Sequence, residues 1–330
     1  MKSNIIKYIF IVFVIFIIIF AIYKINFENQ EKTQNIQENT VQTAQETESI
    51  LKIGISDFDN INPLITKNED IISISTILYE PLLELTSDYG IELKLAEEWS
   101  KSDSTTYLVK LENGIKWEDG TNVTGQDVKF TIEKLQEGKS VYSDYVKNIK
   151  SVEIIDGNTI RINLKEEEPF FEYNLIFPII SSTQFANEDF YQSRLAPIAT
   201  GMYKVTNATE ESMELVQNEN WNNPENIDLK IDKITINFYG TMGDAYNDLK
   251  IGNIDMVSTS IINVEDYIGT IGFATKEYKG RELDFVSLNC KDTILRNKEV
   301  RQAINYAIDK NKINSSVFSN NYYVSSFPID

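Results

Sequence analysis

The side chains of this 330-residue sequence that could perform covalent or acid–base chemistry are of few kinds. It holds one cysteine, Cys290, and no histidine, against 50 aspartates and glutamates. A Cys–His nucleophile pair, a serine triad built on histidine and a typical zinc site are therefore excluded. Cys290 alone cannot form an intramolecular disulfide, and we interpret it as a small buried apolar residue. The chemistry that remains is that of carboxylates.

Paired carboxylates can hydrolyse glycosides when they flank the scissile bond. Runs of acidic residues occur at Glu97–Glu98 and at Glu166–Glu168. With 50 acidic residues such pairs arise by chance, so we interpret both runs as solvated surface. These residues therefore give no specific sign of an enzyme, and we expect neither a metal site nor a cofactor.

The overall charge narrows the class of partner. The formal net charge of −19 repels phosphate backbones, which argues against nucleic acid as a partner. An apolar content of 42% is enough for a sizeable core. The same acidity keeps a surface soluble, and we expect a monomer.

An uncharged run at the N-terminus, Tyr8–Tyr23, is flanked by Lys7 and Lys24. The run is nearly long enough for a bilayer core, and no small-residue cleavage site follows it. We therefore predict a membrane anchor or uncleaved signal over residues 1–25, with the rest of the chain outside the cytoplasm. A cleaved signal peptide is the alternative. Residues 26–49 are rich in Gln, Asn, Glu and Thr and should form a disordered tether.

The elements that position any site follow from alternation and helical spacing. Helices are expected at 71–85, where Pro81 should bend the helix, after Thr124 with Asp127 at its third position, and at 243–252. Asn113-Gly114 and Asp156-Gly157-Asn158 should be hairpin turns. Strands are predicted at 51–56, on both sides of each turn within 105–117 and 152–164, and at 202–205, 212–217, 232–239 and 254–258. This mixture indicates an α/β body (mixed α+β).

Ordered blocks along the chain resemble one known family. They are INPL, LYEPLLEL and KLAEEW, then TYLVKLENGIKWEDGTNVTGQDVKFTIEKL, PIATGMYKV with ENW, AYNDLKIGNIDMV, DFVSLNCKD and EVRQAINYAIDKNKI. In order over Leu51 to Ile313, they resemble the dipeptide- and oligopeptide-binding proteins of ABC importers, the extracellular solute-binding protein family 5. Ala199 and Met202 depart from the family's usual glycine and proline.

The resemblance implies a two-lobed, periplasmic-binding-protein-like fold whose second lobe is incomplete in this chain. The first lobe would hold residues 50–90 and 182–270, with a subdomain inserted at 91–181. The second lobe would begin at 271–330. The apolar side of the helix that contains Val300 and Ile308 is expected to belong to a core.

The family encloses a peptide between its lobes, which implies a binding role for several residues of this chain. Candidate ligand-binding residues are Asp57, Phe58 and Asn60 after the first strand, Tyr142, and Phe285, Ser287 and Asn289, which alternate along a predicted strand. The expected partners are a short peptide and the subunits of an ABC permease. Alternatives are another solute (a metal chelate, an oligosaccharide or a signalling peptide) or a truncated surface interaction protein.

Overall fold

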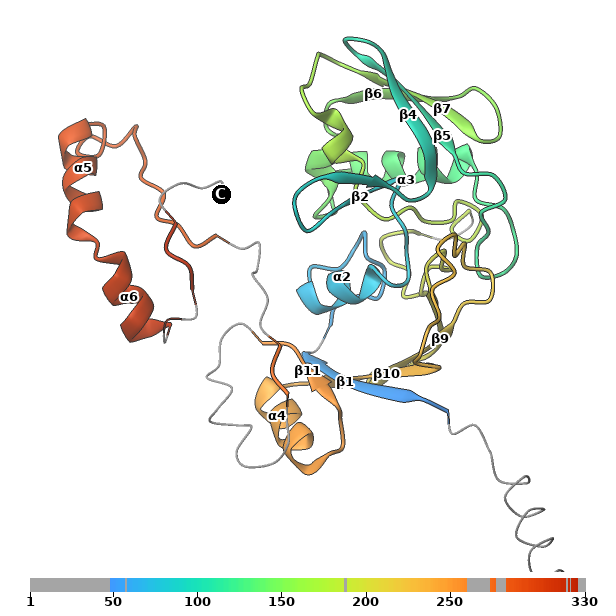
Figure 1. Ribbon diagram of the computed structural model, residues 1–330. Helices are drawn as coiled ribbons and strands as arrows, with labels where there is room; N and C mark the ends of the chain where they lie inside the picture. The colour runs from blue at the N-terminus through green and yellow to red at the C-terminus, as the bar shows by residue number, and fades with distance from the viewer. Residues whose placement is uncertain are drawn as a thin grey trace, which may run out of the picture. The chain divides into compact units, whose positions relative to one another are not determined.

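The computed structural model describes residues 48–56, 58–186, 189–259, 274–276, 283–318, 320 and 322–325 (Figure 1). The predicted anchor and tether lie almost wholly outside these residues. Within the described ranges, no helix has the length and apolar character needed to cross a membrane.

The chain divides into two units, residues 1–50 with 230–232, and residues 51–229 with 233–330. In the first unit, the backbone N–H of Ser49 donates to the carboxylate of Asp232 at 2.8 Å. The N–H of Asp232 donates back to the carbonyl of Ser49 at 2.9 Å. The second unit carries nearly all of the regular structure that follows.

A five-stranded sheet has the order β11-β1-β10-β9-β8. Strands β8, β9 and β10 form an antiparallel meander, whereas β1 pairs in parallel with β11, Ile53 lying opposite Met256. All five overlap strands expected from alternation, although β8 extends further and β11 is shorter than expected. Their bounds are Ile50–Ser56 for β1, Tyr203–Ala208 for β8, Ser212–Gln217 for β9, Lys233–Tyr239 for β10 and Met256–Val257 for β11.

Helix α4 (Met242–Ile251) connects β10 to β11, as predicted. The Thr241 side chain caps its first turn, and Gly252 ends it with φ 80°, a conformation that glycine adopts without strain. The helix packs through Ala245 and Leu249 against Ile254. This small cluster covers the end of the sheet where β1 and β11 pair.

A second, antiparallel sheet of four strands has the order β4-β5-β7-β6. The predicted turn at Asp156–Asn158 joins β6 to β7. Strands β5 and β7 alternate between buried and half-buried residues, so their apolar side chains point to one face. The bounds are Ala96–Asp103 for β4, Thr106–Leu111 for β5, Ile149–Ile154 for β6 and Thr159–Leu164 for β7.

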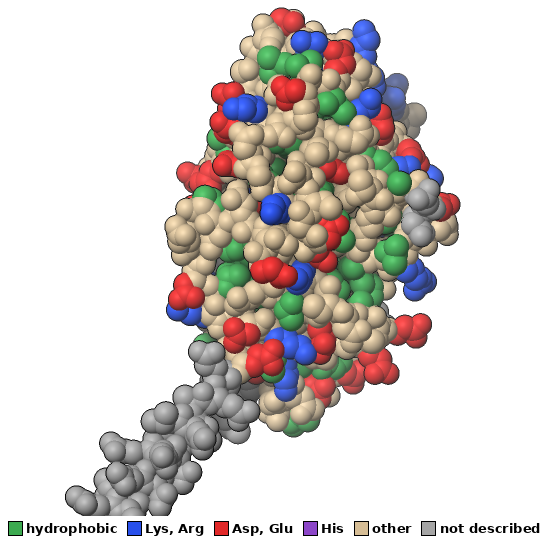
Figure 2. Space-filling view, turned by 90° about the vertical axis from the view of Figure 1, so that its right-hand side faces the viewer, with side chains coloured by type: hydrophobic (Ala, Val, Ile, Leu, Met, Phe, Trp, Pro, Cys, Tyr) green, Lys and Arg blue, Asp and Glu red, His purple; other side chains and the backbone are tan. Residues whose placement is uncertain are grey.

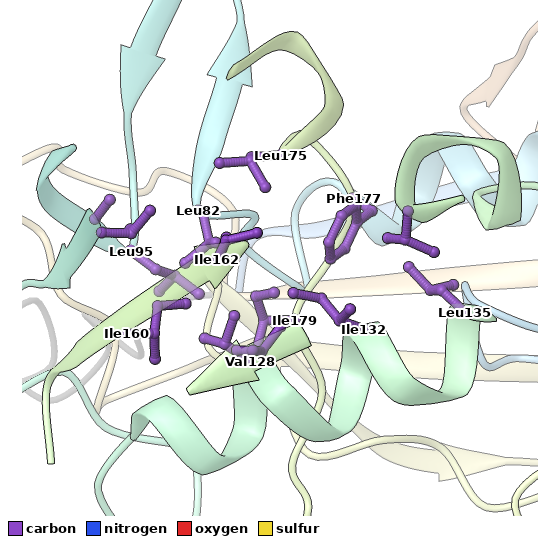
Figure 3. Close-up of a cluster of buried hydrophobic side chains, with 14 of the residues drawn as sticks. Leu82, Leu95, Val128, Ile132, Leu135, Ile160, Ile162, Leu175, Phe177 and Ile179 are labelled. Atoms are coloured by element: carbon purple, nitrogen blue, oxygen red, sulfur yellow. The ribbon is translucent and has the colours of Figure 1, made fainter. Parts of the chain in front are cut away.

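Helix α3 (Gly125–Gln136) covers that apolar face. Val128 of the helix lies beside Ile160 of β7, and Val128, Ile132, Leu135, Ile160 and Ile162 are all buried in the same cluster (Figure 3). The Asp127 carboxylate accepts hydrogen bonds from the backbone and side chain of Thr124, as the predicted helix start requires. The buried side chains of α3 and of the four-stranded sheet belong to one contiguous hydrophobic cluster.

Shorter elements complete the described chain. Strands β2 and β3 pair with each other. On the face shown in Figure 2, acidic and basic side chains are intermixed, and small hydrophobic areas lie between them. The bounds are Glu69–Ser75 for α2, Leu83–Leu85 for β2, Ile91–Leu93 for β3, Ser143–Val146 for the 3-10 helix η1, Phe171–Asn174 for the 3-10 helix η2, Lys298–Ala307 for α5 and Lys310–Val317 for α6.

Two local predictions in the first half of the chain were wrong. The helix expected at 71–85 ends at Ser75, because Pro81 forms a bridge with Pro178 and the following residues join β2. The Asn113-Gly114 turn forms, with Gly114 at φ 81°, but no strand after it pairs with β5. Instead β5 lies between β4 and β7, and it pairs with each of them over most of its length.

The C-terminal predictions also need correction. Residues 283–289 are not a strand, since no neighbouring strand pairs with them in the described chain. The single helix expected there is two, α5 and α6, which Ile308 and Asp309 separate. Neither helix has a buried residue, and Cys290 is exposed rather than buried. An amphipathic pattern creates a core only when another apolar surface covers it.

Candidate functional site

The loop that follows β1 holds two of the predicted ligand-binding residues. The Phe58 ring packs against Phe238, with 4.2 Å between ring centroids. The Asn60 side chain accepts a hydrogen bond from the N–H of Asn62 at 2.8 Å and donates one to the carbonyl of Ser193 at 3.1 Å. Asp57, the third residue predicted for this wall, lies outside the described residues.

Asp59 fixes the shape of this loop. Its carboxylate accepts hydrogen bonds from the Thr66 hydroxyl and from the backbone N–H groups of Asn60 and Lys67. Burial alone raises the pKa of this carboxyl, but the hydrogen bonds, led by that from Thr66, outweigh burial and lower its pKa. The charged loop is therefore held in one conformation before any ligand arrives, which lowers the entropic cost of binding.

The side-chain amide of Asn62, near the same loop, includes an N–H group that donates no hydrogen bond within the described residues. The residue is fully buried, and its Oδ1 accepts the N–H of Leu64 at 3.0 Å. Its Nδ2 has no hydrogen-bond partner in the described part of the chain. Buried amides normally find a partner, so this N–H is suited to a buried water molecule beneath the loop.

Tyr142 precedes η1 and belongs to the region of the four-stranded sheet. Its half-buried ring packs against the large core cluster and lies 5.9 Å from the ring of Tyr145. Burial raises the pKa of Tyr142 to about 12, so its hydroxyl stays neutral and can donate a hydrogen bond. The Tyr142 ring thus has a packing role, and its hydroxyl group can donate a hydrogen bond.

Phe285, Ser287 and Asn289 lie in an exposed segment without regular structure. The Phe285 side chain is 74% exposed, and the Asn289 carbonyl oxygen Oδ1 accepts the N–H of Lys291 at 3.0 Å, which forms a turn. Because the segment is not a strand, the predicted alternation does not align these three side chains. The structure brings Phe58 and Asn60 together in one loop and gives Tyr142 and the 285–289 group separate surroundings.

Sequence reasoning missed a polar cluster centred on Glu80. The indole N–H of Trp221 donates to the Glu80 carboxyl at 3.2 Å, and the backbone N–H of Glu80 donates to the Thr200 hydroxyl at 3.0 Å. Nearby, the Glu118 carboxylate accepts the N–H of Ala199 at 2.7 Å. Glu80 and Trp221 stand in the blocks LYEPLLEL and ENW, but nothing in either block indicates that they meet.

Burial raises the pKa of Glu80 to about 7 from its usual 4.5, against the opposing hydrogen bond from Trp221. The folded state therefore holds a proton that the unfolded chain releases between these values. Stability from this group is full below about pH 4.5 and is lost as the pH rises through about 7. Glutamine is neutral at every pH. As the pH rises through this window, the free energy of unfolding of Glu80→Gln should therefore increase relative to that of the native protein. The gain is at most about 3.5 kcal/mol, as one pKa unit corresponds to about 1.4 kcal/mol.

Urea denaturation of both proteins at several pH values between 4 and 8 measures this difference. Glu92→Gln, at an exposed position of β3, is the matched control for removing a carboxylate. Parallel stability–pH curves for Glu80→Gln and the native protein would contradict the assignment of a buried, protonated Glu80.

Metal binding by clustered ligands has no support within the described ranges, where no three Cys, Asp or Glu residues are grouped to hold an ion. A depression of about 440 Å³ is lined by Lys147, Asn148 and residues 165–169. Its polar groups bind one another, since Asn148 donates to the carbonyl of Glu166 at 3.0 Å and to the carboxylate of Glu168 at 2.8 Å.

Comparison with known proteins places these features in context. The family of bacterial extracellular solute-binding proteins, family 5 (middle), matches residues 90–329. A Brucella ovis protein described as a candidate peptide-binding component of an ABC transporter is 27% identical over 255 residues, which is 73% of this chain and 46% of that protein. Heme-binding protein A of Haemophilus influenzae is 26% identical over 273 residues, 73% of this chain and 49% of that protein.

Among solved structures, the crystal structure of NikZ from Campylobacter jejuni in complex with Ni(L-His) is similar, with a TM-score of 0.71 and 26% identity. The similarity covers 84% of this chain and 57% of that one. The chain thus spans about half the length of the curated relatives that it matches.

Proposed function

Because the chain belongs to the bacterial extracellular solute-binding proteins of family 5, we propose that the protein captures short peptides for the permease of an ABC importer. Proteins of this family bind solutes and are not enzymes. The observation that carries the peptide assignment is the similarity, over 73% of the chain, to a candidate peptide-binding component of an ABC transporter.

The geometry of the loop after β1 supports this proposal. A peptide gains affinity from its backbone when that backbone pairs with open strand edges, and pockets then tolerate different side chains. In the five-stranded sheet, β11 and β8 are the terminal strands. Phe58 and Asn60 lie beyond the end of β1, the neighbour of β11, in a loop that Asp59 holds in place. We assign these two residues, with Asp57, to one wall of the peptide site.

The remaining candidate residues would contribute from other parts of the chain. We assign Tyr142, through its hydroxyl, and Phe285, Ser287 and Asn289 as further ligand contacts. The exposure of Phe285 supports this role, because an aromatic ring that is 74% exposed has most of its surface available to a ligand.

We propose the domain boundaries that the family's two-lobed arrangement implies, and the positions of the two sheets along the chain support them. The five-stranded sheet draws its strands from 50–56 and 203–257, which lie in the proposed first lobe. The four-stranded sheet lies entirely within 96–164, inside the proposed insertion of residues 91–181. Residues 271–330 would begin the second lobe. We further propose that residues 1–25 anchor the protein in the membrane and that it acts as a monomer outside the cytoplasm.

Calorimetry on the native gene product tests the ligand assignment. We expect a mixed library of short peptides to bind with a dissociation constant near 1 µM, about −8 kcal/mol. Phe58→Ala should weaken binding about tenfold, which corresponds to about 1.4 kcal/mol, because the ring covers part of the loop wall. Ile251→Ala removes another exposed apolar side chain, 72% exposed and distant in sequence, and serves as the control with unchanged affinity.

Two other ligands are the outcomes that would overturn the peptide assignment. The relatives include a heme-binding protein and a protein in complex with Ni(L-His). Saturable heat with heme or with nickel–histidine, and none with peptides, would reassign the solute class. No heat with any solute would favour the surface interaction protein instead.

A further inference from the structure

Three aromatic side chains near η2 are exposed and lie together. Phe170 is 73% exposed, Tyr89 50% and Tyr173 36%. The Tyr173 hydroxyl donates to the carbonyl of Tyr89 at 3.2 Å, and the rings of Phe170 and Tyr173 meet edge to face with 6.3 Å between centroids. We refer to Tyr89, Phe170 and Tyr173 as the aromatic surface.

The backbone holds two of these rings outward at an energetic cost. Tyr89 has φ 65° and Phe170 has φ 59°, the left-handed region that residues with a Cβ rarely adopt. The next residue, Phe171, is fully buried and packs on Tyr107 with 4.9 Å between centroids. The turn therefore sends one phenylalanine into the core and its neighbour into solvent. Strain of this kind is found where a side chain is needed in a particular place.

The segments that carry the aromatic surface are acidic. The segments 86–92 and 165–173, which carry the three rings, contain six acidic residues and one basic residue, Lys165. The Lys165 ammonium group donates to the carbonyl of Lys147, and Lys101 pairs with Glu167 at 3.2 Å. Asp88 accepts a hydrogen bond from Thr86, which lowers its pKa and keeps it charged.

We propose that the aromatic surface is a docking site for a basic segment of a partner protein, one that presents arginine or lysine side chains to the three rings. A cation over an aromatic ring is attracted by the negative face of the ring. The carboxylates of Asp88 and Glu172, next to Tyr89 and Tyr173 in sequence, complement the same charge. Aromatic residues are enriched in protein interfaces, where large rings fill the centre of the contact.

The charge of the surface argues against other occupants. Anionic lipid head groups and nucleic acids would be repelled by the net negative charge of these segments. A second copy of this chain would present a net charge of −19 to an acidic surface, which opposes self-association. A basic protein segment satisfies both the rings and the carboxylates.

Site-specific photocross-linking in the native cells tests the proposal. A benzoylphenylalanine at position 170 keeps the phenyl ring, and the same residue at Ile251, which is 72% exposed, is the matched control. We expect cross-linking to an identified protein at position 170 at least about threefold above position 251, since one cation–π contact alone is worth that factor. Mass spectrometry should place the cross-link in a segment that carries Arg or Lys.

A charge reversal then separates docking from chance contact. Glu172→Lys should lower the cross-link at position 170 about threefold or more, because it repels the basic segment, whereas Glu210→Lys, at an exposed position of the β8–β9 turn, should leave it unchanged. Equal yields at 170 and 251, cross-links to lipid or glycan, or insensitivity to Glu172→Lys would each overturn the proposal. Peptide affinity, measured separately by calorimetry, does not enter this test.

Discussion

Asp127→Ala is expected to lower the free energy of unfolding by about 3 to 5 kcal/mol, the largest effect anticipated for one carboxylate in the described chain. The Asp127 side chain is only 3% exposed. Its carboxylate accepts two hydrogen bonds from Thr124, at 2.9 and 3.0 Å, and two from Ser182, both at 2.8 Å. Alanine leaves all four donors without this acceptor and removes the Asp127 half of the capping box at the start of α3. Urea denaturation measures the loss.

Two further variants separate the causes. Asp127→Asn keeps the size of the side chain and one acceptor oxygen, so it should lose roughly half as much as alanine. Asp144→Ala removes a carboxylate whose side chain is 89% exposed, and its effect should stay within about 0.5 kcal/mol. A loss below about 1 kcal/mol for Asp127→Ala would mean that the tie between α3 and Ser182 contributes little to stability.

Gly201→Ala should destabilise the protein by about 3 kcal/mol, although it adds one methyl group. A Cβ at this position would lie 2.6 Å from the carbonyl oxygen of Ile77 and 2.8 Å from the carbonyl carbon of Leu78. Both are backbone atoms, which cannot rotate away. The N–H of Gly201 also donates to the carbonyl of Leu78 at 2.8 Å, so the two segments cannot separate without losing that bond. Thermal and urea unfolding both report the change.

Gly243→Ala is the matched control for the same chemical change. Gly243 lies in α4, and the nearest atom to an added Cβ is the Thr241 hydroxyl at 3.5 Å, an ordinary contact. Alanine should therefore stabilise the helix by up to about 1 kcal/mol. If both variants shifted stability equally, close packing at Gly201 would not be the cause of its loss.

Elements whose signals are local could be predicted from the sequence. Helix α3 has its start at Thr124 and an apolar side made of Val128, Ile132 and Leu135, and all of these features act within three turns of chain. The turn at Asp156–Asn158 likewise determines that β6 and β7 pair. These signals need no knowledge of the rest of the fold, and the structure confirms both elements.

Features that depend on distant partners could not be predicted in the same way. The Asn113-Gly114 turn forms, but β5 does not pair with the segment that follows the turn. It pairs with β4 and β7 instead, one of which lies far along the chain. The alternation of Phe285, Ser287 and Asn289 requires a neighbouring strand, and the segment has none in the described ranges. The amphipathic spacing of α5 indicates a core only if something covers it. Cys290 is exposed for the same reason.

The candidate site shows the same division. The turn-rich residues after β1 indicated a loop at Phe58 and Asn60, but not that Asp59 would hold it through Thr66 and Lys67. The meeting of Glu80 with Trp221 joins residues 141 positions apart. Such contacts follow from tertiary packing, and no spacing rule within either block could have found them.

The parallel pairing of β1 with β11 also constrains when the fold can form during synthesis. The N–H of Lys52 donates to the carboxylate of Asp255, 203 positions later in the chain, and β1 lies between β10 and β11. A ribosome adding about 5 to 20 residues per second needs roughly 10 to 40 s to supply that partner. The four-stranded sheet, contained in residues 96–164, can fold in the meantime. Until β10 and then β11 have been synthesised, β1 has unpaired edges, and an unpaired strand edge can pair with another chain and aggregate.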